Sequence, residues 1–153
     1  MKLVACVALS IAAVTAAFAQ DSGKASVLAD KLGDAFQKSD LQGINDVVAK
    51  NAAVYWISQK YFGQVAFDKY LRGQFDSDDH RTLSFNPDGG VEDETISTSW
   101  GTFGFTTSNS NNPISSQLIG RYTAIATEVD GKWRIISIHL SVSNPPDGPT
   151  IIN

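Results

Sequence analysis

The clearest pattern of apolar and polar positions lies near the C-terminus, between residues 115 and 142. Two runs rich in β-branched and aromatic residues flank the dipeptide Asp130-Gly131, which suits the left-handed dihedral angles of a two-residue type I′ turn. The pattern predicts a β-hairpin. Counting outward from this turn along both strands places Tyr122 opposite His139.

The same count assigns every hairpin residue to a face, because side chains alternate along a strand. One face then carries Trp133, Ile135, Ser137, His139 and Ser141 with Glu128, Ala126, Ala124, Tyr122 and Gly120. The other carries Arg134, Ile136, Ile138 and Leu140 with Thr127, Ile125, Thr123 and Arg121. Both faces are partly apolar, so we expect both to be covered.

Helical spacing dominates the first half of the chain. Between residues 21 and 39 the pattern predicts an amphipathic helix, whose apolar stripe is Leu28, Leu32, Ala35 and Phe36. Asp40 is a typical N-cap for a second, short helix. A third helix is expected from about residue 64 to residue 75.

The remaining segments predict strands. Short runs at residues 53–57 and 82–85 have β-type composition, and a longer strand is expected at residues 94–107. Turn formers at residues 86–90 predict a turn between the last two. Gly101 and Gly104 inside the long strand indicate a bulge, a bend or the close approach of another backbone. Helices followed by antiparallel strands predict an α+β fold, with helices on one side of a curved sheet.

The first residues have a separate pattern. Lys2 precedes an apolar run from Leu3 to Phe18, and an A-x-A site ends at Ala19. These features are typical of a secretory signal peptide, here residues 1–19, cut after Ala19. The run is short for a membrane span. We therefore expect a periplasmic or secreted protein without membrane association after cleavage; an uncleaved anchor helix is the alternative.

Composition narrows the function classes. The chain has 153 residues, of which 42% are hydrophobic and 18% charged, which suits one globular domain. A formal net charge of −4 without a basic run argues against nucleic-acid binding. The one cysteine, Cys6, lies in the predicted signal peptide, so we expect no disulfide in the mature chain. We expect no cofactor and no metal, because the acidic segment before His80 lacks the spacing of a calcium loop.

Several short motifs match, in order and spacing, those of one superfamily. They are Gly63-Gln64-Val65-Ala66-Phe67, Ser99-Trp100-Gly101-Thr102-Phe103, Gly120-Arg121-Tyr122, and Asp130-Gly131-Lys132-Trp133-Arg134-Ile135 with His139 and Ser141. On these residues the chain resembles the nuclear-transport-factor-2-like superfamily. It is most similar to its SnoaL-like and ketosteroid-isomerase-like bacterial members, and also to the association domain of calmodulin-dependent kinase II. The resemblance covers residues 22–145 and leaves 146–153 as an irregular tail.

The resemblance implies a cone-shaped α+β domain. In such a domain about three N-terminal helices close a curved antiparallel sheet around a pocket, and two copies often pair through the sheet. The superfamily contains isomerases, cyclases, dehydratases, binding proteins and assembly domains, so the fold leaves the function open. Steroid-type isomerisation is not expected, because apart from Glu128 no acidic residue stands in an apolar strand.

His139 and Tyr122 are the candidate catalytic residues. If their face lines the cone, as the resemblance implies, the imidazole can act as a general acid or base and the phenol as a second donor. The alternative is that His139 only satisfies a buried polar position. The candidate ligand-binding residues are Tyr55, Trp56, Trp100, Tyr122, Ser137 and His139.

Three functions remain open at this point. The first is an exported domain with a pocket for a small, largely apolar ligand. The second is an enzyme of the isomerase, dehydratase or cyclase type that uses His139 as acid or base. The third is a homodimerisation or assembly module whose sheet face includes Arg121, Ile136 and Ile138.

Overall fold

The computed structural model describes residues 23–109 and 112–142. Its elements are α1 (Lys24–Gln37), α2 (Leu41–Val47), β1 (Val48–Trp56), β2 (Gln59–Phe62), α3 (Gln64–Phe75), β3 (Asp79–Glu92), β4 (Ile96–Asn109), β5 (Asn112–Val129) and β6 (Lys132–Ser141). The predicted signal peptide and the predicted tail at 146–153 lie outside the described residues. None of the helices within the described ranges is long and apolar enough to cross a membrane.

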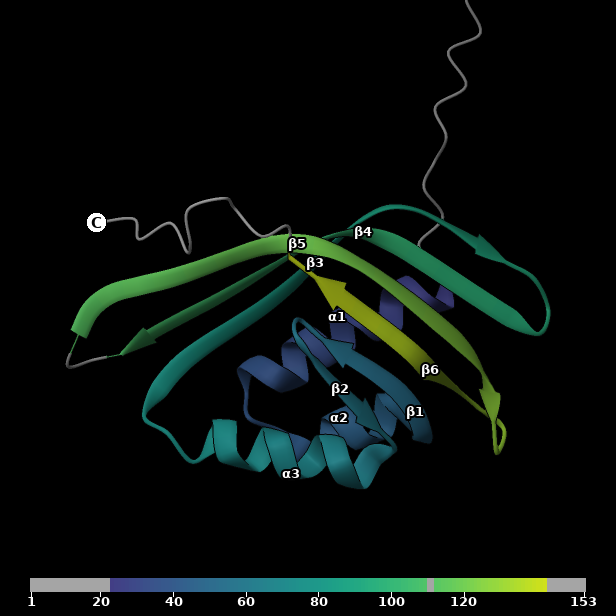
Figure 1. The fold of residues 1–153 in the computed structure, drawn as a ribbon. Coiled ribbons are helices and arrows are strands. Elements are labelled where there is room, and N and C mark those ends of the chain that lie inside the picture. The colour runs from purple at the N-terminus through teal and green to yellow at the C-terminus, as the bar shows by residue number, and fades with distance from the viewer. Residues whose placement is uncertain (1–22, 110–111, 143–153) are drawn as a thin grey trace, which may run out of the picture.

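The strands form one sheet in the order β2-β1-β6-β5-β4-β3. Figure 1 shows the sheet arched over the helices, so its concave inner face carries the core and its convex outer face carries no helix. This arrangement confirms the predicted α+β fold. The sheet differs from the prediction in one pairing, because β1 and β6 are parallel whereas the other neighbours are antiparallel.

Local sequence explains the ends of several elements. Asp40 caps α2 as predicted, since its carboxylate accepts a hydrogen bond from the Gly43 amide at 2.9 Å. Asp130 and Gly131 both have positive φ angles, of 52° and 74°, as a type I′ turn requires. The predicted hairpin is therefore confirmed, and its two strands are β5 and β6.

The register between these two strands shifts by one residue. Ala126 lies opposite Ile135, but the next pair joins Ile125 to Ser137, so Ile136 has no opposite residue. An extra residue of this kind is a β-bulge, and it moves every later side chain of its strand to the other face.

The bulge corrects the predicted faces of β6. Tyr122 lies opposite Leu140, and His139 lies opposite Thr123. Tyr122, Leu140 and Ile138 are buried on the inner face, whereas His139 is exposed on the outer face. The prediction that Tyr122 and His139 face each other is wrong, because it rested on an uninterrupted count from the turn. Ile138 cannot belong to the predicted dimer face for the same reason.

A second correction concerns residues 86–90, which form no turn. β3 continues through them, with Asp88 as an extra residue opposite β4. The backbone beside the bulge lies close to Gly101, which is opposite Pro87. A Cβ atom added at Gly101 would lie 2.1 Å from the carbonyl oxygen of Asn86. The predicted close approach of another backbone at Gly101 is thus confirmed.

The core lies between α1, α3 and the inner face of the sheet. Phe36 of α1 is its centre, with ring centroids 5.4 Å from Trp56, 5.5 Å from Phe75 and 5.9 Å from Phe105. Trp56 in turn lies 5.4 Å from Phe67 of α3. Aromatic side chains from both helices and from strands β1 and β4 therefore pack together in the cone interior.

Candidate functional site

The inner-face candidate Tyr122 is already bonded to another protein group. Its hydroxyl lies 2.8 Å from the hydroxyl of Ser99, and its ring packs edge-on against Phe85 at 4.9 Å. Tyr122 and Ser99 are each only 2% exposed. Burial raises the pKa of the Tyr122 phenol, and the hydrogen bond with Ser99 opposes that rise. The phenol is thus a neutral, satisfied group in the core.

Trp56 is the other candidate on the inner face. Besides Phe36 and Phe67, its ring lies 6.4 Å from that of Tyr70, and its side chain is hydrogen-bonded to the Tyr70 hydroxyl. Trp56 is 2% exposed, and three aromatic rings of the protein surround it. Ligand binding by Trp56 and Tyr122 stays a prediction, and it requires that these contacts be displaced.

The other four candidates, Tyr55, Trp100, Ser137 and His139, lie on the outer face. Three of them belong to one row that crosses the whole sheet, which is Lys60, Tyr55, His139, Thr123, Trp100 and Gly89. The ring of His139 lies 5.4 Å from that of Tyr55. The structure therefore separates His139 from Tyr122 by the thickness of the sheet.

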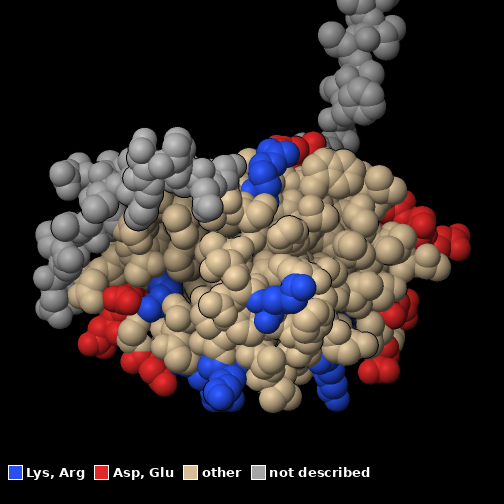
Figure 2. Space-filling model, viewed as in Figure 1, with Lys and Arg blue, Asp and Glu red and all other residues tan. Residues whose placement is uncertain are grey.

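The outer face is poor in charge. β1, β6 and β5 run across the view of Figure 1, and Figure 2 shows few charged side chains over the centre of that view and more along its margins. The side chains of Phe62, Val91 and Trp100 are 64%, 63% and 38% exposed on this face. Arg121 is also on it, where its guanidinium forms an ion pair with Asp88 at 2.8 Å.

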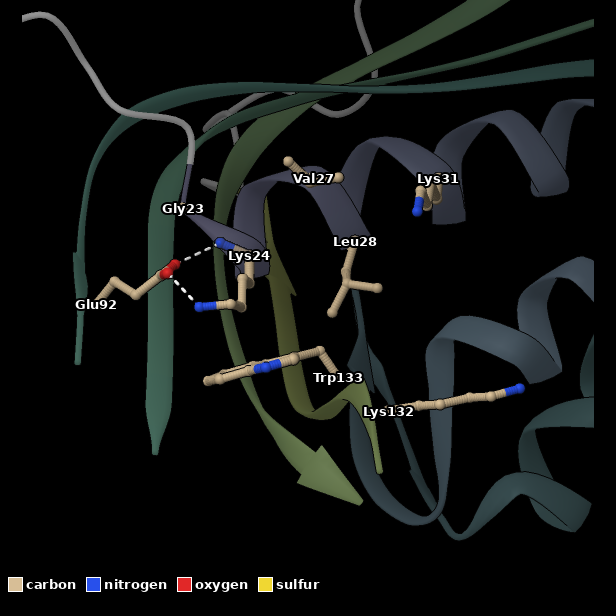
Figure 3. Close-up of a pocket in the computed structure, with 8 residues that line it drawn as sticks. All are labelled: Gly23, Lys24, Val27, Leu28, Lys31, Glu92, Lys132 and Trp133. Carbon is tan, nitrogen blue, oxygen red and sulfur yellow. Dashed lines mark hydrogen bonds and ion pairs between the residues drawn. The ribbon is translucent and has the colours of Figure 1, made fainter. Parts of the chain in front are cut away.

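Besides the two faces of the sheet, the structure contains a groove that was not predicted from the sequence. It lies between α1 and the start of β6, and we call it the Trp133 groove. It has a volume of about 680 Å³ and is open to solvent; its lining residues are Gly23, Lys24, Val27, Leu28, Lys31, Glu92, Lys132 and Trp133. Figure 3 shows Leu28 and the Trp133 ring between the two walls.

One end of the groove is fixed by Glu92. Its carboxylate accepts hydrogen bonds from both the backbone amide and the ammonium group of Lys24, each at 2.6 Å. Ser97 donates to the same carboxylate at 3.0 Å and accepts from the Ala25 amide at 2.9 Å. The hydrogen bond from the Lys24 ammonium is the main reason that the pKa of Glu92 is lowered. These bonds satisfy the first amides of α1 and attach the helix to β3 and β4.

The rest of the groove combines apolar surface with positive charge. The Lys24 ammonium lies 4.4 Å from the ring centre of Trp133, within the range of a cation–π contact. Lys31 lies on the α1 wall and Lys132 on the β6 wall (Figure 3). Both are exposed, and the described part of the chain provides neither with an ion-pair partner. The groove therefore combines apolar surface with two lining lysines that have no ion-pair partner among the described residues, and Figure 3 shows the Lys132 side chain extending away from the Trp133 ring.

The described residues were also searched for a metal site. No group of three or more His, Cys, Asp or Glu side chains there is arranged to hold a metal ion.

Comparisons with known proteins find similarity in structure alone. No family model and no curated protein matches the sequence. A putative calmodulin-dependent kinase II association domain from Xanthomonas campestris has a TM-score of 0.62 at 20% identity, over 82% of this chain and 90% of that one. A nuclear-transport-factor-2-like protein from Salmonella enterica has a TM-score of 0.66 at 14% identity, over 78% and 89%. A ketosteroid-isomerase-like protein from Erwinia carotovora has a TM-score of 0.66 at 10% identity, over 79% and 95%. At these identities the likeness establishes the fold and leaves the function open.

Proposed function

We propose that this chain, which has the nuclear-transport-factor-2-like fold, is a small-ligand-binding domain whose ligand lies in the Trp133 groove. The observation that carries the proposal is the groove itself, where Trp133 and Leu28 lie beside Lys31 and Lys132. Its volume of about 680 Å³ falls within the range of about 300–1,000 Å³ typical of sites for small organic molecules.

The groove is a better site than the cone interior because two of its charged groups, Lys31 and Lys132, have no ion-pair partner within the described residues. In the interior, Tyr122 and Trp56 are bonded to Ser99 and Tyr70, so a ligand there must break contacts before it makes any. An acid–base role for His139 faces another difficulty, because a substrate has to bind on the open outer face to reach the imidazole.

Native mass spectrometry of the protein from its own source tests the proposal. We expect an adduct of small-molecule mass that is lost in Trp133→Leu. The matched control is Trp100→Leu, which removes a tryptophan from the outer face and keeps the adduct. An adduct that survives Trp133→Leu and disappears in Trp100→Leu would move the site to the outer face and refute the groove.

A second candidate function, homodimerisation through the outer face, has its own support. The face is made of six strands that hold between 4 and 18 residues each. With strands spaced about 4.8 Å apart and about 3.3 Å per residue, its geometric area is on the order of 1,000 Å². A stable interface covers about 800 Å² per partner. The low charge and the exposed Phe62 and Val91 suit a self-complementary contact between two copies.

Sedimentation of wild type and variants tests the dimer. We expect a dimer that Phe62→Lys and Val91→Lys each convert to monomer, because each places a charge in the apolar contact. The control is Val65→Lys, since Val65 is 85% exposed but lies on α3. A wild type that is monomeric at micromolar concentration contradicts this candidate.

Export also belongs to the proposal. It is supported by the signal-peptide pattern of residues 1–19. N-terminal sequencing of the protein recovered outside the cytoplasm should begin at Gln20. Recovery of the intact chain from the cytoplasm alone would contradict it.

A further inference from the structure

We infer that the ligand of the Trp133 groove is an amphipathic organic anion. Its apolar body lies against Trp133 and Leu28, and its single sulfonate, carboxylate or phosphate group is neutralised by Lys31 and Lys132. The inference rests on the proposed function and adds the chemical class of the ligand.

The first step is the balance of charge in the groove. Four charged side chains line it, and two of them, Lys24 and Glu92, neutralise each other in the ion pair at 2.6 Å. The remaining two, Lys31 and Lys132, are both positive. Like charges in one concave surface add their potentials and attract an anion. The groove is thus positive although the whole chain has a formal net charge of −4.

The second step is the apolar surface. Leu28 is nearly buried at 7% exposure, while Val27 of the same helix is 39% exposed at the groove. The Trp133 ring is half-buried and adds rigid contact area that loses little conformational entropy on binding. A bare inorganic anion leaves this surface and most of the volume unused, because one water-sized molecule occupies only about 30 Å³. The occupant is therefore organic.

The third step limits the ligand to one anionic group. Past Lys31 and Trp133 the hollow continues toward α2, where three aspartates and one further lysine line it, namely Asp34, Asp40, Asp46 and Lys38. The carboxylates outnumber the added ammonium group at that end. Carboxylates repel a second negative group at that end. A molecule with one anionic group near Lys31 and Lys132 and an uncharged remainder fits both ends, whereas an extended polyanion does not.

Two fluorescent probes with the same ring body test the class of ligand. They are 8-anilinonaphthalene-1-sulfonate, which is anionic, and N-phenyl-1-naphthylamine, which lacks the sulfonate. In titrations of the wild-type protein we expect the sulfonate to bind about tenfold more tightly, and added salt to remove the difference, because exposed charges are screened. We expect Trp133→Leu to weaken both probes alike.

Lysine variants locate the preference. We expect Lys31→Gln and Lys132→Gln each to weaken the sulfonate about two- to fivefold and to leave the neutral probe unchanged. The control Lys69→Gln removes the same charge from α3 and should change neither probe. Trp100→Leu, on the outer face, should also change neither.

The outcomes separate the inference from the proposed function. Equal affinity for both probes, with both weakened by Trp133→Leu, overturns the anionic class and keeps the groove as the binding site. Binding of neither probe to the groove, seen as no effect of Trp133→Leu, overturns the proposed site as well. A sulfonate preference that survives loss of both lysines places the anion elsewhere and also overturns the inference.

Discussion

The hydrogen bond between Ser99 and Tyr122 allows a sharp test of whether Tyr122 is a core residue or a functional one. Both side chains are 2% exposed and their hydroxyl oxygens are 2.8 Å apart. Ser99→Ala leaves the phenol buried without a partner, which costs about 1–3 kcal/mol of unfolding free energy. Tyr122→Phe leaves the Ser99 hydroxyl buried without a partner in turn, and should lower the free energy of unfolding by a similar amount.

The double variant distinguishes the bond from the packing. Ser99→Ala with Tyr122→Phe removes both hydroxyl groups and leaves no orphaned one, so we expect it to be less destabilised than the sum of the single variants by about 1–2 kcal/mol. Urea unfolding followed by fluorescence gives the four free energies. Ser84→Ala, an exposed serine of β3, is the control and should change stability by less than about 0.5 kcal/mol.

An unchanged free energy of unfolding in Ser99→Ala would refute the reasoning. The Tyr122 hydroxyl would then have another partner, such as water in a cavity that reaches solvent. That outcome would restore the cone interior as a candidate ligand site.

Three further predictions use contacts described above. Gly101→Ala should destabilise the fold by about 1–3 kcal/mol, because its Cβ atom meets a backbone oxygen, whereas Gly104→Ala meets only one side-chain oxygen, at 3.1 Å, and should cost less in the same urea assay. The pKa of Glu92 is lowered in the folded protein, chiefly by the hydrogen bond from Lys24. Its ionised form therefore stabilises the fold fully above the ordinary carboxyl pKa of 4.5, and this contribution is lost progressively as pH falls from that value through the lowered folded pKa. When urea unfolding is compared at neutral and acidic pH, Glu92→Gln should lose less stability than wild type. His139→Ala, at an exposed position, should change stability by less than about 0.5 kcal/mol, and a larger loss measured by urea unfolding would show that the outer face is covered.

Most elements could be predicted from the sequence, although β2 was missed and β1 and β3 are longer than expected. Two irregularities in the strands could not be predicted from simple counting. The bulge on β6 has a trace in the sequence: Trp133 and Ile135 hold one alternation, whereas Ile138 and Leu140 hold the opposite one. The phase changes at Ile136. A count from the turn misses this change because both faces contain apolar residues, so the apolar pattern alone does not show which face is the core.

The predicted turn at residues 86–90 failed for a related reason. Proline and glycine are typical of turns, but β3 lies at the edge of the sheet, where proline and bulges are tolerated within a strand. Whether a strand is an edge strand depends on the complete sheet order, which the local sequence does not contain.

The Trp133 groove was not accessible to sequence reasoning at all. Its walls come from α1 and β6, which lie at opposite ends of the described chain. Lys31 and Lys132 line the same groove only because the helix packs beside the hairpin. By contrast, the aromatic residues predicted to bind a ligand follow patterns that also suit a core, and Trp56 is in fact buried there.

The parallel pairing of β1 with β6 has a consequence for how the chain acquires its fold. β6 lies between β1 and β5, so the first two strands have no connection to the rest of the sheet until the last strand is available. During synthesis, β1 and β2 therefore remain a separate two-stranded hairpin, which is marginally stable in water at best. The six-stranded sheet is completed only when β6 is added. A sheet completed by its last strand suits a polypeptide proposed to cross a membrane before it folds.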